Sequence, residues 1–148
     1  MKETIDLILV PTDFSELSCQ AFPWAALLAQ QFDARILIVH VIQERDAFVM
    51  TAKPGNPWER VLEREDRAMI EAFRSRMESD ITSGTETQTL VEVGVADEKL
   101  IEAAQNNKAD LIVMATHGRT GLSHALIGSV AEKVVRKAPC PVFTVRPS

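Results

Sequence analysis

Residues 111–132 read LIVMATHGRTGLSHALIGSVAE, and this stretch decides the fold. It opens with an apolar run, 111–115, without alternating polar residues, which is typical of a parallel strand buried on both faces. The segment from Gly118 to Gly128 then holds three of the six glycines of the chain. Ser129 and Glu132 have the spacing of a capping box, with a hydroxyl for an amide at the helix start and a carboxylate three residues on. The stretch therefore predicts a strand, a glycine loop and a helix.

The same alternation of strands and helices extends over the rest of the chain. Strands are expected at 7–10, 36–41, 87–93, 111–115 and 142–145, and helices at about 15–32, from 57 onward, at about 97–106 and at about 129–137. Strict alternation implies right-handed crossovers and a parallel sheet that is covered on both faces. We therefore predict one α/β domain over residues 1–148, a three-layer α/β/α sandwich around a five-stranded parallel sheet.

Two of the expected helices carry distinctive residues. Pro23 lies well inside the first, where a proline costs roughly 3 kcal/mol, so we expect a kink there or a helix that starts later. The long helix after the 43–56 loop has Asn56 as its cap and Pro57 at its first position. Its apolar stripe, including its methionines, is expected in the core. The stripe consists of Trp58, Val61, Leu62, Met69, Ala72, Phe73 and Met77.

Composition narrows the classes of partner. The 148 residues are 46% hydrophobic and carry a formal net charge of −5, which argues against general attraction to nucleic acid or an anionic membrane. No apolar run approaches the roughly 18 residues that span a bilayer, and residues 1–6 do not resemble a signal peptide. We expect a cytoplasmic protein. Cys19 and Cys140 are expected to be small core residues without a redox role.

Ligands of open parallel sheets bind beyond the carboxyl ends of the strands, where the chain switches direction. If the first and fourth strands are neighbours, Asp13 and Gly118 share one crevice. Asp13 could accept hydrogen bonds from an adenine amine or from ribose hydroxyls. The helix start at 128–130 offers unpaired amides and a partial positive charge to phosphate. A side chain at Gly128 would keep phosphate from the backbone.

Each of these residues also has a purely structural interpretation. Asp13 is equally well explained as a turn residue that accepts from an amide two positions on, and Ser129 as a simple helix cap. His117 and His124 have no nucleophile or metal-ligand partner nearby in sequence, so loop hydrogen bonding or exposure is favoured. His40, at the end of an apolar strand, is expected to be buried and hydrogen-bonded. Among the cations near the loop, Arg119 alone is placed to meet a ligand.

Familiar catalytic signatures are absent from the sequence. No glycine is followed by lysine, which excludes a P-loop, and there is no Gly-x-Ser-x-Gly elbow, His-Glu-x-x-His helix or Cys-x-x-Cys pair. We therefore expect no catalytic residue, no metal site and no enzyme activity.

The chain resembles the universal stress protein family, whose ATP-binding branch carries the motif Gly-x2-Gly-x9-Gly-[Ser/Thr] after the fourth strand. Ala115 stands at the first glycine position, Gly118 at the second, and Gly128-Ser129 closes the motif. The resemblance extends over essentially the whole chain, including Val10-Pro11-Thr12-Asp13 and His40-Val41. It implies a Rossmann-like fold of the adenine nucleotide alpha hydrolase type, with strand order 3-2-1-4-5.

The resemblance also implies a ligand and the residues that bind it. The ligand is ATP, or ADP or AMP, with Mg as counterion. Asp13 and the backbone of Val41 would meet adenine and ribose, with Pro11 and Thr12 lining that wall and Met114 and Ala115 flooring the site. The phosphates would lie on Gly118, Arg119, Gly128, Ser129 and Val130. A homodimer that pairs the last strand across a two-fold axis is expected, with the protein partner unknown.

The function that follows is that of a nucleotide-binding regulator or sensor in a stress response. One rival is a protein of the same fold that binds no nucleotide and acts through protein contacts, because the Ala115 methyl group could narrow the site. The other is a slow ATPase, for which His117 and His124 are the only plausible bases. Replacement of Gly128 by valine is expected to remove ATP affinity with the fold intact. The 43–56 loop is expected to overhang the adenine end.

Overall fold

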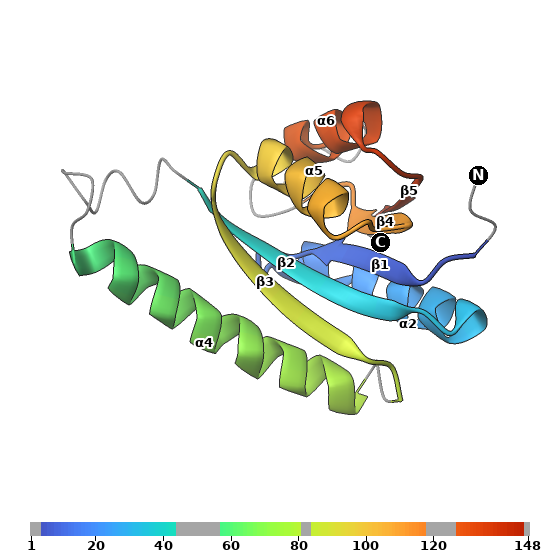
Figure 1. The fold of residues 1–148 in the computed structure, drawn as a ribbon, viewed down its shortest axis with the longest axis horizontal. Coiled ribbons are helices and arrows are strands. Elements are labelled where there is room, and N and C mark those ends of the chain that lie inside the picture. Colours follow the sequence, from blue (N-terminus) through green and yellow to red (C-terminus); the bar gives the residue numbers. More distant parts are fainter. Residues whose placement is uncertain (1–3, 44–56, 81–83, 118–126, 147–148) are drawn as a thin grey trace.

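The computed structural model describes residues 4–43, 57–80, 84–117 and 127–146. They form one parallel sheet with helices on both faces (Figure 1). The strands are β1 Leu7–Pro11, β2 Arg35–Gln43, β3 Thr87–Gly94, β4 Leu111–Ala115 and β5 Val142–Val145. The helices are α1 Glu16–Cys19, α2 Ala21–Phe32, α4 Pro57–Asp80, α5 Ala96–Asn106 and α6 Ser129–Lys137. The order β3-β2-β1-β4-β5 confirms the predicted topology.

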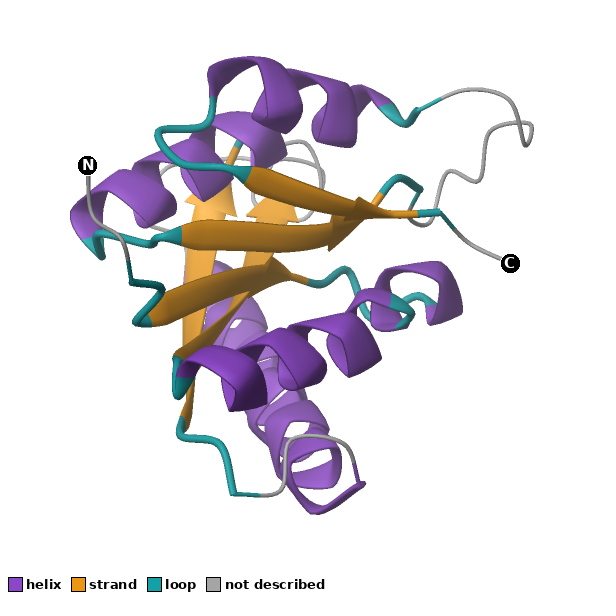
Figure 2. Ribbon diagram, turned by 90° about the vertical axis from the view of Figure 1, so that its right-hand side faces the viewer, coloured by secondary structure: helices purple, strands orange, loops and turns teal. Residues whose placement is uncertain are grey.

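The alternation of side chains along each strand divides the core into two layers. On β1, Ile8 and Val10 face α2 and α4, whereas Leu7 and Leu9 face α5 and α6. All four are buried, as expected for a strand covered on both faces. The two helical layers and the twisted sheet between them are seen edge-on in Figure 2. The three-layer sandwich is therefore confirmed.

The first predicted helix is two helices. α1 ends at Cys19, and Gln20 separates it from α2, which begins at Ala21. Pro23 thus stands at the third position of α2, where its missing amide has no intrahelical acceptor to lose. The helix that contains Pro23 therefore starts later than Ser15, which was one of the two predicted alternatives. The unexpected feature is the separate short helix α1, which begins after Ser15, whose hydroxyl accepts from the Ser18 amide at 3.1 Å.

The buried face of α4 differs from the predicted stripe. Ile70, which the stripe omitted, is 1% exposed, whereas Met69 is 51% exposed and Ala72 is also exposed. The core-packing prediction is therefore wrong for Met69 and Ala72, but Phe73 does pack against the core. The reason is geometric: residues 66, 70 and 73 share the helix face that meets the sheet. Asn56 lies outside the described residues, as do the side chains of Trp58, Val61, Leu62 and Met77.

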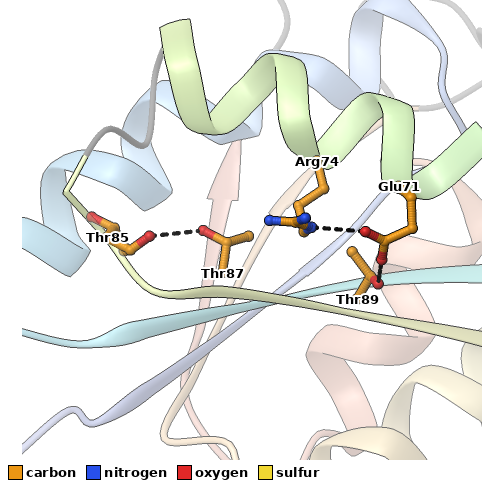
Figure 3. A network of polar contacts seen from close by, with 5 residues as sticks. All are labelled: Glu71, Arg74, Thr85, Thr87 and Thr89. Atoms are coloured by element: carbon orange, nitrogen blue, oxygen red, sulfur yellow. Dashed lines mark hydrogen bonds and ion pairs between the residues drawn. The ribbon is translucent and has the colours of Figure 1, made fainter.

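Polar contacts fasten α4 to the edge strand β3 (Figure 3). The Thr89 hydroxyl donates to Oε1 of Glu71, and Arg74 Nε donates to Glu71 Oε2 at 3.0 Å. These hydrogen bonds, with that from Thr89 the stronger influence, hold the pKa of Glu71 below its usual value. Nearby on β3, the Thr87 hydroxyl donates to the Thr85 carbonyl at 3.1 Å. The helix is thus held to β3 by side chains as well as by its apolar face.

Both cysteines are free thiols and only partly buried. Burial raises the pKa of Cys19, and the charge of Asp13 acts in the same direction. Burial likewise raises the pKa of Cys140, which packs against the core beneath α5 and α6. The two residues therefore resemble small hydrophobic groups, but at the margin of the core.

Among the described residues, no helix is long and apolar enough to cross a membrane. The same part of the chain contains no group of three or more histidine, cysteine or acidic residues that could hold a metal ion.

Candidate functional site

The sheet divides between β1 and β4 at its carboxyl end. The two strands pair only through Ile8 with Leu111 and Leu9 with Ile112, although β1 continues to Pro11 and β4 to Ala115. Pro11 stays in register with Val39 of β2, and Ala115 with Val145 of β5. The chain leaves β1 toward β2 and leaves β4 toward β5, so this division is the topological switch point of the sheet, where ligands of such folds bind.

The loop after β1 is built around buried Thr12. The Thr12 amide donates to the Val39 carbonyl at 2.9 Å, and its hydroxyl accepts from the Phe14 amide at 3.0 Å and lies 3.2 Å from the Ser18 hydroxyl. Phe14 adopts a left-handed φ of 64°, which is unusual for a residue with a side chain. Thr12 and Phe14 both turn inward, and this fixes the place of Asp13 between them.

Asp13 is half-buried and forms the expected turn. Its Oδ1 accepts from the Ser15 amide at 3.0 Å and from the Ser15 hydroxyl. The turn interpretation is therefore confirmed, and it is compatible with a second role, because a carboxylate has acceptor sites for several donors. The turn holds the carboxylate at the carboxyl end of β1, beside the switch point.

The backbone of Val41 faces the same end of the sheet. Arg35 donates its amide toward β1, to Asp6, and Ile36 donates toward β3, to Glu86. Because alternate residues of a strand direct their peptide groups to the same side, the groups of Val41 face the β1 side of β2. The register of β1 with β2 ends at Val39, so Val41 extends beyond the paired part of β1.

The start of α6 supplies the amides that the sequence predicted, but the cap is a different residue. Gly128 is the N-cap, and no side chain caps the helix. The predicted capping box is wrong, because Ser129 already lies inside the helix and Glu132 accepts from Arg136 at 2.6 Å instead of folding back. The first intrahelical bond runs from the Glu132 amide to the Gly128 carbonyl at 2.9 Å. The amides of residues 129–131 precede it and have no intrahelical acceptor.

A glycine is needed at position 128 because the backbone there lies against the Thr116 carbonyl, and not only because phosphate must reach the backbone. Its amide donates to the Thr116 carbonyl at 2.7 Å, and a Cβ atom there would lie 2.9 Å from the same oxygen. Replacement by valine therefore disturbs the fold locally, contrary to the expectation of a variant with the fold intact. This contact joins the start of α6 to the end of β4.

Ala115, at the first glycine position of the motif, is accommodated without strain. It is the last residue of β4, is buried, and is not among the described residues with positive φ. Its side chain shares a face with Leu111 and Val113, which pack toward α2 and α4, whereas Met114 packs on the α6 side. The methyl group therefore points away from the sheet face that carries α6.

The histidines differ in their surroundings. His40 is 7% exposed and hydrogen-bonded, as predicted. His117 Nδ1 lies 2.9 Å from the Thr116 hydroxyl, and its Nε2 is buried with no hydrogen-bond partner among the described residues. His124, Gly118, Arg119 and the 43–56 loop except Gln43 lie outside the described residues. Arg136 and Lys137 behave as helix C-terminal cations, since they occupy the last turn of α6.

Sequence reasoning missed two residues that shape this site. Phe14 stacks near His40, and Asp66 of α4 contacts the same imidazole. Asp66 could have been found from its position, because it is a charged residue one turn before Ile70, on the side of α4 that faces the sheet. Nothing local distinguishes Phe14 from an ordinary core residue.

Fold and strand order together define a doubly wound parallel α/β protein whose switch point lies between its first and fourth strands. The model of the universal stress protein family matches residues 4–146, and the chain belongs to that family. It is 37% identical over 139 residues to universal stress protein MJ0531 of Methanocaldococcus jannaschii, covering 94% of this chain and 81% of that protein.

Solved structures agree with this assignment. The structure of MJ0577, from the same organism, superposes with a TM-score of 0.82 at 26% identity over 98% of each chain. A universal stress protein in complex with cAMP superposes with a TM-score of 0.64 at 24% identity, over 99% of this chain and all of the other. At that identity the likeness shows the fold alone.

Proposed function

We propose that this protein binds an adenine nucleotide at the switch point between β1 and β4 and acts as a cytoplasmic regulator or sensor in a stress response. The observation that carries the proposal is that two elements lie at the carboxyl ends of the neighbouring strands β1 and β4: the Asp13 turn follows β1, and the Gly128–Thr116 hydrogen bond holds the amides at the start of α6 to the end of β4. The solved universal stress protein in complex with cAMP holds an adenine nucleotide on the same fold, which is the class of ligand proposed here.

Adenine and ribose are assigned to the β1–β2 side. The peptide groups of Val41 offer a donor and an acceptor beyond the paired part of β1, and Asp13 offers a carboxylate for ribose hydroxyls, with Pro11 and Thr12 beside them. Phosphates are assigned to the amides of Ser129 and Val130, with Gly118, Arg119 and Gly128 in the same loop and Met114 and Ala115 beneath. ATP, with Mg as counterion, is the proposed ligand, with ADP and AMP as alternatives.

The role proposed is binding rather than turnover. His117 is a poor general base, because its Nε2 is buried and bulk water does not reach it. A bound nucleotide would then act as a signal, read by a protein partner.

The test is to denature freshly purified protein, identify any released nucleotide by chromatography, and titrate the emptied protein with ATP, ADP and AMP by calorimetry, with and without Mg²⁺. Stoichiometric release or micromolar rebinding is expected. Absence of both would refute nucleotide binding and direct attention to protein contacts.

A matched pair of variants locates the site. Asp13→Asn keeps an acceptor for Ser15 but removes the charge, and we expect about tenfold weaker binding. Asp33→Asn is the control, because Asp33 is exposed at the opposite end of the sheet, in a left-handed conformation that asparagine tolerates. Equal affinity of both variants would place the ligand elsewhere.

A further inference from the structure

His40 occupies an unusual place beneath the loop that carries Asp13. It lies near the carboxyl end of β2 and is 7% exposed. Its Nδ1 is 2.9 Å from the Thr12 carbonyl oxygen. Because a carbonyl oxygen only accepts, Nδ1 must carry a proton, and this fixes both the tautomer and the orientation of the ring.

The opposite ring nitrogen contacts a different layer of the molecule. His40 Nε2 lies 3.6 Å from Oδ1 of Asp66, on α4. If Nε2 is protonated as well, this contact is an ion pair. If it is not, the nitrogen lone pair faces the carboxylate without a hydrogen bond. In either state the imidazole is a polar bridge from the loop after β1 to α4.

The aromatic residue after Asp13 is held at the same place. The rings of Phe14 and His40 are 4.4 Å apart between centroids, and Phe14 also meets Phe73 of α4 edge-on at 5.7 Å. The left-handed φ of Phe14 is kept by these contacts, since a side chain in that conformation requires support from its surroundings. Asp13 is therefore flanked by two residues, Thr12 and Phe14, that both rest on His40.

We propose that His40 is a positioning residue for nucleotide binding: it sets the geometry of the Asp13 loop and joins that loop to Asp66, so that ligand affinity depends on a contact made by α4. This inference rests on the proposed function. By the same linkage, a bound nucleotide stabilises the His40 contact with α4, because coupling between two sites is reciprocal. Helix α4 is then the element whose stability changes when the nucleotide site is occupied.

The histidine variants separate the two ends of the bridge. The side-chain nitrogen of asparagine falls close to the place of Nδ1, so His40→Asn retains a donor for Thr12, whereas His40→Leu retains none. We expect His40→Leu to bind nucleotide about tenfold more weakly than wild type, and His40→Asn to recover most of that loss. Rescue by asparagine is the diagnostic result, because a role in packing alone favours leucine over asparagine at a buried position.

The helix end of the bridge has a matched control on α4 itself. Asp66→Asn and Glu71→Gln each remove one carboxylate charge, but Glu71 contacts Thr89 of β3 rather than His40. We expect Asp66→Asn to weaken binding by about two- to fivefold and Glu71→Gln to leave it unchanged. This pair decides the matter if His40→Leu does not fold.

Calorimetric titration of the five proteins, with urea unfolding to confirm that each is folded, gives distinguishable outcomes. If wild type binds nucleotide, and Asp66→Asn and the folded His40 variants bind it with the same affinity as wild type, the inference is overturned and the proposed function is retained. Wild type that binds no nucleotide overturns both. Weaker binding in Asp66→Asn but not Glu71→Gln supports the role of His40.

Discussion

At Gly128 the chain has no room for a side chain. A Cβ atom would lie 2.9 Å from the Thr116 carbonyl oxygen, which also accepts the Gly128 amide at 2.7 Å. The φ of −60° suits any residue, so the restriction is one of space and not of backbone conformation. We expect Gly128→Ala to lower the free energy of unfolding by about 1–3 kcal/mol, measured by urea denaturation, because the β4–α6 contact must move apart.

The neighbouring residue is the control for that measurement. Ser129 is exposed and does not cap α6, so Ser129→Ala should change stability by less than about 0.5 kcal/mol. If Ser129→Ala instead lowers the free energy of unfolding by about 1 kcal/mol, the Ser129 hydroxyl does act as a helix cap. If Gly128→Ala leaves the free energy of unfolding unchanged, the contact with Thr116 can move apart at little cost.

At the scale of elements, the sequence predicted what depends on periodicity. The apolar run of β4 and the alternation of strands with helices predicted the parallel sheet and its three layers, because parallel strands require crossovers of one hand. The strand order was implied by the family resemblance. The predictions were wrong where a contact with a residue distant in the chain determines the local structure. On α4, Ile70 rather than Met69 is buried, because it lies on the helix face that meets the sheet. On α6, Gly128 rather than Ser129 is the N-cap, because Gly128 is the residue that bonds Thr116.

The break between α1 and α2 makes Pro23 harmless. As the third residue of α2, it has no intrahelical hydrogen bond to lose, and it is exposed. We expect Pro23→Ala to change the free energy of unfolding by less than about 1 kcal/mol, whereas Leu28→Pro, in the middle of the same helix, should cost about 3 kcal/mol or more. Urea denaturation of both variants is the measurement. A large loss from Pro23→Ala would mean that the proline itself sets the break.

The whole molecule shows how far a sequence can specify a site. The sequence predicted that the loops after the first and fourth strands carry the candidate ligand residues if these strands are neighbours, and the observed strand order meets that condition. It did not predict the bridge from Thr12 through His40 to Asp66, which joins three segments distant in the chain. Contacts of that kind depend on how α4 crosses the sheet, and no local pattern encodes it.

The outer edge of β5 is where a second copy is expected to pair. β5 is an outermost strand, and the carbonyls of Pro141 and Val145 accept from the amides of Ile112 in β4 and of Thr116 just after it. Alternate residues face opposite sides, so the peptide groups of Val142 and Thr144 point outward and are available to another strand. Beside this edge, the rings of Trp24 and Phe143 are 5.7 Å apart and 47% and 36% exposed. A two-fold partner would cover both the edge and the rings.

Thr144→Pro tests this assembly with little effect on the protomer. It removes an amide that points away from β4, so the ladder between β4 and β5 keeps its bonds, but a partner strand loses a donor. We expect sedimentation velocity to show a dimer for wild type and for the control Thr144→Val, which keeps the amide, and a monomer for Thr144→Pro. A wild-type monomer would rule out the dimer. A dimer that survives the proline would place the interface away from the β5 edge, on another face of the molecule.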